Sequence, residues 1–425
     1  MRFEDLDGLD VVIWGAGREG RAAHAELERR GVVASYAITG DGGDADALAR
    51  LSAADVVIKS PGVPHTSPEF VRLRELGVAI TSLTDLWLSA NADRVLAVTG
   101  TKGKSTTSAL AQHVLTGVGI GASLVGNGGT PVTEDDAAGA QIAVAEVSSY
   151  QAADLTVSPR IAVVTSLYPE HLPWHGGFEQ YVADKLNLVA HGCEVVVVPD
   201  LDGDLADLVR GRAGSARLVD PATIGISWSA DGLDWTGVGR LDATAIPVRG
   251  AHNVANLALA LTAVATGFDV DRAGLLMAVA SFAPLAHRLE QVPSADGRRW
   301  VDDSLATNPE AVVAALETYP QERVALVLGG SDRGLSFAPL REYLAGRTGG
   351  RVEVVAVGPA GARWMAEGGS AHSTLADDFA DALRRLREQR GSDVVLLSPG
   401  APSFDEFASY EERSAAFRAA AAVAG

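Results

Sequence analysis

The segment TGTKGKST, residues 99–106, combines glycines, lysines and hydroxyl side chains at a spacing that could bind a nucleoside triphosphate. An apolar run before it predicts a strand, and an Ala/Leu-rich stretch after it predicts a helix. Helix N-termini bind phosphate through unpaired N–H groups and the positive end of the helix dipole. Lys104 can reach terminal phosphates, and Ser105 or Thr106 can hold Mg²⁺. A surface turn with an incidental lysine, the alternative, does not account for all these features together.

A second glycine-rich turn, WGAGREG at residues 14–20, fits the G-x-G-x-x-G fingerprint of dinucleotide-binding turns. In nicotinamide enzymes an acidic residue about 20 residues later binds the ribose. Ala37, Ile38 and Thr39 occupy that place, and Asp41 comes later, in a glycine-rich loop. An NAD-dependent oxidoreductase is therefore the weaker alternative, and we expect this turn to bind another nucleotide diphosphate.

Both turns must be positioned by strands that end where the glycines begin. Apolar runs predict buried strands at residues 10–15, 55–60, 94–100, 141–147, 160–166, 194–200, 323–330, 352–358 and 393–400. Such strands alternate with helical stretches, which is typical of parallel sheets covered by helices on both faces. The predicted class is therefore α/β, with several sheets. Residues 215–250 are expected to form a small antiparallel insertion.

The chain is long enough for several domains, because single cores stop growing at about 250–300 residues. Its 425 residues are expected to divide into domains at 1–91, 92–286 and 287–425. A net charge of −19 argues against non-specific binding of long nucleic acid. The one cysteine, Cys193, excludes an internal disulfide and a CxxC zinc site. No apolar stretch approaches the roughly 20 residues of a membrane span, and the acidic start lacks a signal peptide. We therefore expect a cytoplasmic protein without membrane contact.

Three further residues stand where a metal-dependent site could form. Glu146 ends an apolar strand, His171 follows another, and Lys185 lies on the next predicted helix. Taken singly, such residues are more often a solvated edge, a structural histidine and a solvated lysine. Their order after the phosphate loop, in P-E-H-L and Y-x-x-x-K, changes that expectation.

The phosphate loop has valine, Val98, where the standard G-x-x-x-x-G-K-[ST] motif has its first glycine, and this tighter form resembles the Mur ligase and folylpolyglutamate synthetase superfamily. These ATP-dependent enzymes join a carboxylate to an amine through an acyl phosphate. The resemblance implies that Lys104 is catalytic and that Ser105, Glu146 and His171 hold Mg²⁺. It also implies that Lys185 is carbamylated and binds a second Mg²⁺.

The resemblance extends, in order, over essentially the whole chain and implies a Rossmann-like first and last domain. It implies ATP contacts by residues Gly100, Thr101, Lys102, Gly103, Lys104, Ser105, Thr106, Asn127, Asn253, Asn256, Arg288 and Asp303. Within this set, Asn127 is expected near the γ-phosphate, Asn253 and Asn256 near adenine, and Asp303 on the ribose. His287 and Arg288 are expected at a hinge between domains.

In the Mur family the first domain binds a UDP-N-acetylmuramoyl substrate. The resemblance assigns that substrate to Gly15, Gly17, Arg18, Glu19, Ser60, Gly62 and Ser148. The short first domain and the tail SPGAPSFDEFASYEER resemble the MurD branch, which adds glutamate to UDP-N-acetylmuramoyl-L-alanine in peptidoglycan precursor synthesis. The implied glutamate contacts are Thr307, Arg333, Ser403 and Tyr410.

Departures from the MurD pattern gather around the amino acid. Leu305 stands where the branch usually has lysine, and Arg333 stands where it has another lysine. Arginine and lysine are not equivalent at a carboxylate site, because the guanidinium is planar and bidentate. A branch that adds L-glutamate, and leaves inversion to a separate epimerase, matches better, and D-glutamate is the alternative. A different amino acid or acceptor stays open. A non-catalytic nucleotide-binding subunit would be expected to have lost one of the implied catalytic residues Lys104, Glu146, His171 and Lys185, and this sequence keeps all four. We expect a monomer.

Overall fold

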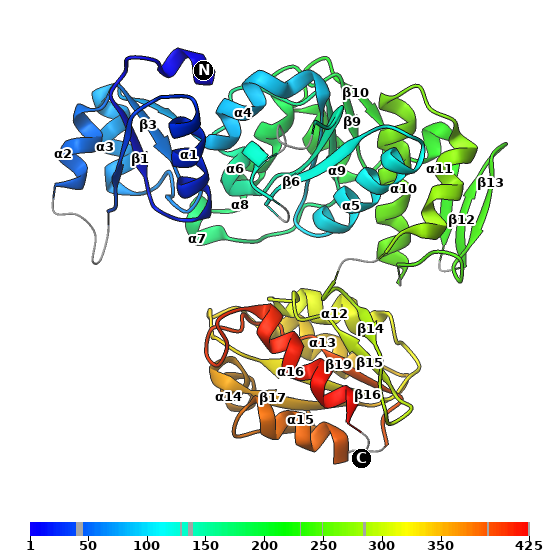
Figure 1. The fold of residues 1–425 in the computed structure, drawn as a ribbon. Helices are drawn as coiled ribbons and strands as arrows, with labels where there is room; N and C mark the ends of the chain where they lie inside the picture. The colour runs from blue at the N-terminus through cyan, green and yellow to red at the C-terminus, as the bar shows by residue number, and fades with distance from the viewer. Residues whose placement is uncertain are drawn as a thin grey trace. The chain divides into compact units, whose positions relative to one another are not determined.

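The computed structural model describes residues 1–39, 46–127, 130–134, 139–229, 231–248, 250–283, 286–388 and 391–423. Asp41 lies outside these residues. The chain forms two compact units, one of residues 1–247 with 253–282 and one of residues 248–252 with 283–425. Figure 1 labels the helices and strands of both units.

The first unit begins with a parallel sheet in the order β2-β1-β3-β4. Its strands are β1 (Val11–Trp14), β2 (Ala34–Ala37), β3 (Val56–Lys59) and β4 (Ala79–Thr81). Its helices are α1 (Arg18–Arg29), α2 (Ala47–Ala53), α3 (Pro68–Leu76) and α4 (Leu83–Asn91), with 3-10 turns at Phe3–Leu6 and Ala92–Arg94. The strand order reverses between β1 and β3, which is the switch point where open α/β sheets bind ligands.

The central sheet of the same unit is also parallel, in the order β10-β9-β8-β5-β7-β6. Its strands are β5 (Val95–Thr99), β6 (Ala122–Gly126), β7 (Ile142–Glu146), β8 (Ile161–Val164), β9 (Val195–Val197) and β10 (Arg217–Val219). Its α-helices are α5 (Lys104–Gly117), α6 (Ser149–Ala152), α7 (Leu172–His175), α8 (Phe178–Leu186), α9 (Asp204–Arg210), α10 (Ala251–Gly267) and α11 (Arg272–Ala278). Because β5 lies between β7 and β8, the loops after these three strands meet at one edge.

The predicted antiparallel insertion is present but shorter than its predicted range. Strands β11 (Ile226–Ser229), β12 (Gly232–Trp235) and β13 (Gly239–Asp242) form a three-stranded meander. Strand β10, in the same predicted range, instead pairs in parallel with β9. Its apolar residues continue the central sheet, where hydrogen-bonding groups of β9 would otherwise lack a partner.

The second unit has one sheet in the order β14-β15-β19-β16-β17-β18. Its strands are β14 (Glu290–Val292), β15 (Arg299–Asp302), β16 (Val324–Gly329), β17 (Val352–Val357), β18 (Ser373–Leu375) and β19 (Val394–Leu397). Only the edge pair β14–β15 is antiparallel among the described strands of this sheet. Its helices are α12 (Pro309–Glu317), α13 (Ala338–Gly346), α14 (Gly358–Ala366), α15 (Phe379–Glu388) and α16 (Tyr410–Ala422).

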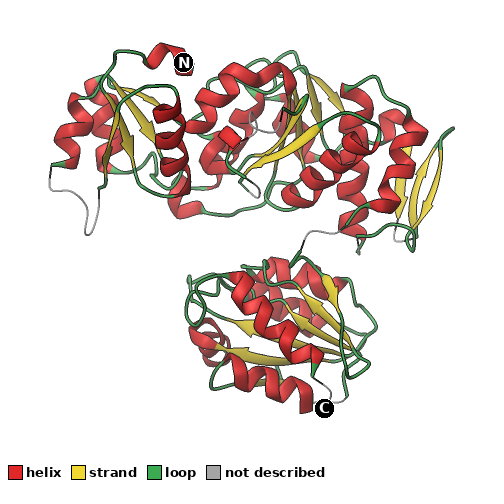
Figure 2. Cartoon of the chain, viewed as in Figure 1, coloured by secondary structure: helices red, strands yellow, loops and turns green. Residues whose placement is uncertain are grey.

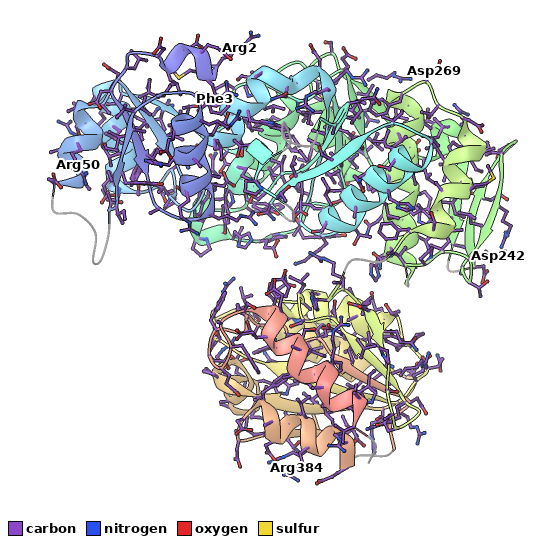
Figure 3. All side chains as sticks on the ribbon, viewed as in Figure 1. Arg2, Phe3, Arg50, Asp242, Asp269 and Arg384 are labelled. Atoms are coloured by element: carbon purple, nitrogen blue, oxygen red, sulfur yellow. The ribbon has the colours of Figure 1, made fainter. Side chains whose placement is uncertain are left out.

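Helices flank the strands of each parallel sheet (Figure 2), which confirms the predicted α/β class. In the second unit, apolar residues of α15 and α16 pack on β16, β17 and β19 as one core cluster. The opposite face of α15 is charged: Arg384 points outward (Figure 3) and pairs with Glu388 and Asp381. Among the described helices, none is both long and apolar enough to cross a bilayer.

The predicted boundary near residue 91 does not coincide with a division between the two compact units. One apolar cluster contains Leu27 of α1, Trp87 of α4 and Val95 of β5, so packing is continuous across this point. The chain nevertheless changes from one sheet to another there. The boundaries at 91 and 286 therefore remain predictions.

Candidate active site

The phosphate loop connects the end of β5 to the start of α5, as the sequence predicts. Gly100 has φ 147° and Gly103 has φ 86°, which L side chains rarely adopt. A Cβ on Gly100 would lie 1.9 Å from Thr165 Oγ1, and one on Gly103 would lie 2.4 Å from Asn256 Oδ1. Gly103 is also the N-cap of α5 and offers no capping side chain. The helix start can therefore accept a phosphate at close approach.

Two lysines converge on one backbone oxygen of this loop. Lys104 Nζ donates to the carbonyl oxygens of Gly100 (3.0 Å) and Thr101 (3.1 Å), and Lys185 Nζ donates to Gly100 O at 2.9 Å. Lys185 is only 2% exposed. Burial, and then the charge of Lys104, lower the pKa of Lys185 well below its ordinary value. The fold thus holds the Lys185 amine in conditions that favour its neutral form.

Of the other predicted metal ligands, Ser105 lies in the first turn of α5, and Glu146 and His171 border the same loop. Glu146, at the end of β7, is buried and accepts a hydrogen bond from Asn127 Nδ2 at 2.9 Å. His171 has a left-handed backbone, with φ 55°, at the start of α7. Burial lowers the pKa of His171, and the charges of Lys185 and Lys104 add to this effect against the opposing charge of Glu170. His171 therefore lies within electrostatic reach of both lysines.

The structure adds residues that the sequence analysis did not assign. Glu170 pairs with Lys102 at 2.8 Å. Burial alone would raise the pKa of Glu170, but the charge and hydrogen bond of Lys102, together with the charges of His171 and Lys104, outweigh burial, and the pKa falls. The Tyr181 hydroxyl lies 2.6 Å from Thr101 Oγ1, which ties the phosphate loop to α8. The Y-x-x-x-K spacing places Tyr181 one helical turn before Lys185, so the motif itself could have indicated this contact.

A buried hydrogen-bonded series also connects the segments that carry the metal candidates. His175 Nδ1 lies 2.7 Å from Asp184 Oδ2, and its Nε2 lies 3.0 Å from Ser149 Oγ. The three residues are buried, so the Ser149 hydroxyl is not accessible as a nucleophile. Because Ser149 begins α6 after Glu146 and Asp184 precedes Lys185, the series positions these elements relative to each other. Isolated residues on short helices offered no sequence pattern for it.

The N-terminal turn also lies beside the central sheet. Ser60 Oγ donates to Gly15 O at 3.2 Å, so the ends of β3 and β1 meet, and Gly17 is the N-cap of α1. Arg18 Nη2 donates to the carbonyl oxygens of Gly126 (3.3 Å) and Asn127 (3.0 Å).

The next residue of the turn faces the same way. Glu19 accepts from Gln151 Nε2 at 2.6 Å, and burial raises the pKa of Glu19. Ser148, another predicted substrate residue, caps α6 through Gln151 N. Gly62, on the loop after β3, is exposed, and its carbonyl accepts from Trp174 Nε1. The predicted substrate residues of the two segments are thus brought together in one unit, although Arg18, Glu19 and Ser148 already have protein partners.

The remaining ATP candidates fall in both units. Asn256 Nδ2 donates to Asn253 Oδ1 at 3.1 Å, and the position of Asn256 beside Gly103 places this pair at the phosphate loop. In the second unit, Asp303 is buried and accepts from Ser398 Oγ at 2.8 Å. Burial raises the pKa of Asp303 to about 7, and Arg288 opposes that rise.

The predicted glutamate residues follow neighbouring strands of the second unit's sheet: three lie on loops, and Tyr410 is the first residue of α16. Thr307 follows β15, Arg333 follows β16, and Ser403 and Tyr410 follow β19. Ser403 is buried, Thr307 and Tyr410 are half-buried, and Arg333 is exposed. Because β15, β19 and β16 are neighbours in parallel, their carboxyl ends bring these loops together.

One group of potential metal ligands was not predicted. In the part of the chain that the structure describes, His287, Glu290 and Asp302 are the one set of three such side chains within 4.8 Å. Arg418 already pairs with both Glu290 and Asp302. His287 Nδ1 lies 2.8 Å from Asp302 Oδ2. The guanidinium supplies the positive charge that a metal would bring, so we interpret this group as an ion-pair network.

The site and the sheet topology define a class of protein. Residues 98–264 match the Mur ligase middle domain, and residues 287–400 match the Mur ligase glutamate ligase domain. The chain belongs to the Mur ligase family and is an enzyme of that family.

Its relatives include UDP-N-acetylmuramoyl-L-alanine–L-glutamate ligases. That of Micromonospora sp. is 42% identical, with 98% of this chain and 97% of the relative covered. That of Salinispora tropica is 41% identical, with 98% of each chain covered.

Solved structures support the fold at low sequence identity. MurF from Acinetobacter baumannii aligns with a TM-score of 0.63 and 18% identity, over 96% of this chain and 90% of MurF. FolC from E. coli, in complex with DHPP and ADP, aligns with a TM-score of 0.57 and 17% identity, over 79% of this chain and 91% of FolC.

Proposed function

We propose that this enzyme joins L-glutamate to UDP-N-acetylmuramoyl-L-alanine and cleaves ATP to ADP and phosphate. The observation that carries this proposal is the convergence of Lys104 and Lys185 on Gly100 O, beside Glu146 and within electrostatic reach of His171. Lys104 would contact the phosphoryl group that is transferred from ATP. Mg²⁺ would supply charge neutralisation at the ATP phosphates.

The chemistry proposed requires two anions to meet. A carboxylate oxygen of the alanyl group attacks the γ-phosphorus of ATP, the bond to the β-phosphate oxygen breaks, and ADP leaves. Lys104 offsets the repulsion and stabilises charge on the transferred phosphoryl group. The amine of glutamate then attacks the acyl carbonyl, loses a proton, and phosphate leaves as the amide bond forms.

The donor set fits Mg²⁺, because hard cations prefer carboxylate and hydroxyl oxygens. Glu146 and Ser105 supply such oxygens, and His171 adds an imidazole nitrogen. We propose that Lys185 is carbamylated and contributes to a second Mg²⁺ site. Carbamylation consumes a neutral amine, and the burial of Lys185 beside Lys104 favours that form. The product is an anion, which the positive charge of Lys104 attracts.

The choice of L-glutamate rests on the relatives and on two residues. Relatives that are 41–42% identical over almost the full chain have names that specify L-glutamate. Leu305 and Arg333 alter the cations around the amino acid relative to the MurD pattern. A product with an L-glutamyl residue would require a separate epimerase if the pathway needs D-glutamate at that position.

The test uses the purified full chain with Mg-ATP and UDP-N-acetylmuramoyl-L-alanine. Phosphate release is followed with L- or D-glutamate in parallel, and the product mass is determined. We expect turnover with L-glutamate and none when the acceptor is omitted. Turnover with D-glutamate alone would overturn the proposal that the enzyme uses L-glutamate. No turnover with either enantiomer would overturn the proposal that UDP-N-acetylmuramoyl-L-alanine is the acceptor. The Lys104→Met variant is the control for contaminating phosphatase activity.

A further inference from the structure

Arg413, in the first turn of α16, is a buried cation whose hydrogen bonds go to neutral oxygens. It is 2% exposed, and its Nε donates to Ser304 Oγ at 3.1 Å. Its Nη2 donates to Ser304 O at 2.9 Å and its Nη1 to Ala401 O at 3.1 Å. Within the described chain, no carboxylate oxygen lies within 4.0 Å of this guanidinium. Asp405 and Asp302 affect its charge only from farther away.

The position of Arg413 is as specific as its bonding. Helix α16 packs against β15 (Figure 1), and the bonds of Arg413 reach the loops after β15 and β19. A Cβ on Gly330, in the loop after β16, would lie 3.1 Å from Arg413 Nη1. These three strands are neighbours in parallel, so Arg413 lies where their carboxyl ends meet. Parallel α/β sheets bind ligands at that edge.

The same loops carry the residues proposed to contact glutamate. Ser304 precedes Thr307 on one loop, and its hydroxyl donates to the carbonyl oxygen of Tyr410 at 3.1 Å. Ala401 precedes Ser403 on another. Leu305 leaves the first of these loops without the lysine expected at that position. From α16, Arg413 brings a buried positive charge to these two loops through its hydrogen bonds to Ser304 and Ala401.

We propose that Arg413 is a specificity-determining positioning residue whose positive charge attracts a carboxylate of the incoming amino acid. Its three hydrogen bonds hold in place the loops that bind this amino acid. The inference rests on the proposed glutamate ligation. A buried ion without a counter-ion costs stability, because no partner charge offsets its loss of hydration. An anionic substrate at this edge would supply the missing counter-charge. Burial lowers the pKa of Arg413 to about 10, so it stays charged at neutral pH.

The chain contains a matched control in Arg347. Its guanidinium also donates to neutral oxygens, among them Gly350 O at 2.7 Å and Leu316 O at 3.3 Å. Arg347 lies in the same unit and also donates to the carbonyl oxygen of Glu322. Gly350 precedes β17 and Glu322 precedes β16, so both acceptors lie at the amino ends of these strands. A guanidinium that only joins loops is thus present at the edge opposite the proposed glutamate residues.

The experiment compares Arg413→Lys and Arg413→Gln with Arg347→Gln. Both Arg413 variants can donate hydrogen bonds, but only lysine keeps the charge. The ratio kcat/KM is measured for glutamate, for glutamine and for glutamic acid α-amide, with ATP and acceptor saturating. Hydroxylamine, an amine without a carboxylate, replaces glutamate in a parallel assay that reports folding and ATP cleavage.

We expect Arg413→Gln to lower kcat/KM for glutamate by about tenfold or more, since a unit charge acts strongly at short range in a low-dielectric site. In Arg413→Gln, the ratio of kcat/KM for glutamate to that for one of its amides should fall, and turnover with hydroxylamine should persist. Arg413→Lys should recover part of the lost preference for glutamate. Arg347→Gln should leave the preference unchanged. An equal loss for glutamate, both amides and hydroxylamine, or no loss at all, would overturn the inference. Failure of the wild-type enzyme to use glutamate would instead overturn the proposed function.

Discussion

Lys104 and Lys185, which are 81 positions apart in the chain, donate to the same carbonyl oxygen of Gly100 at 3.0 and 2.9 Å. A second ammonium group at this acceptor would be repelled by that of Lys104, and burial of Lys185 adds a desolvation cost, so the Lys185 amine favours its neutral form. The arrangement makes sense when anions enter: phosphate beside Lys104, and a carbamate in place of the Lys185 amine.

Replacing Lys104 should remove catalysis without unfolding the chain. We expect Lys104→Met to lower glutamate-dependent phosphate release by about 10²–10³-fold, because a positive group at the developing phosphoryl charge is lost. Lys102→Met should cost less, since Lys102 already pairs with Glu170. Steady-state kinetics and circular dichroism measure both effects. Equal losses in the two variants would contradict the assigned role of Lys104.

The Lys185 amine should react with CO₂ at neutral pH. Protein equilibrated with ¹³C-bicarbonate should show a carbamate carbon resonance in its ¹³C NMR spectrum, and Lys185→Ala should lose that resonance. The physical reason is the lowered pKa of Lys185, which leaves the nucleophilic neutral amine available. A spectrum in which wild-type and Lys185→Ala proteins are identical would show that this lysine stays unmodified.

A buried ion pair should hold the two sheets of the first unit together. Lys59, at the end of β3, lies 2.9 Å from Asp154, and both side chains are buried. Lys59→Met should lower the free energy of unfolding by about 3–5 kcal/mol, because an uncompensated carboxylate stays buried. His65, 2.7 Å from Asp154, can offset part of this loss.

The double variant Lys59→Met with Asp154→Leu is the control for that prediction. It should recover most of the stability, since neither charge is then buried. Urea unfolding of the four proteins in this cycle measures the coupling. A double variant that is as unstable as Lys59→Met would show that the unpaired carboxylate of Asp154 is not the cause of the lost stability.

Asp303 should give the stability of the second unit an unusual pH dependence. Its folded pKa, about 7, lies above the ordinary value of 3.8, so the folded state holds a proton that the unfolded state has released. Stability from this group is present below pH 3.8 and is lost as pH rises to about 7, at up to about 1.4 kcal/mol per pH unit. Asp303→Asn should abolish this slope in urea unfolding between pH 4 and 8. Parallel slopes for both proteins would show that Asp303 ionises normally.

Local sequence determined the phosphate loop and the class of fold. Glycines at 100 and 103, the lysine after them and the apolar runs on either side all act within a few residues of each other, so their pattern predicts strand, turn and helix. The structure confirms that geometry, with Gly100 and Gly103 in conformations that favour glycine. Glu146 at a strand end and Lys185 on a helix were also correctly located on their elements.

Tertiary structure decided what those residues touch. The meeting of Lys185 with Gly100, the series His175–Asp184–Ser149 and the three bonds of Arg413 all depend on which strands are neighbours. Strand order in a parallel sheet is set by burial and packing between distant segments, and no local pattern encodes it. The sequence around a single histidine or arginine on a helix therefore does not indicate which residue it contacts. Burial, which shifts the pKa values of Lys185 and Asp303, exists only in the folded chain.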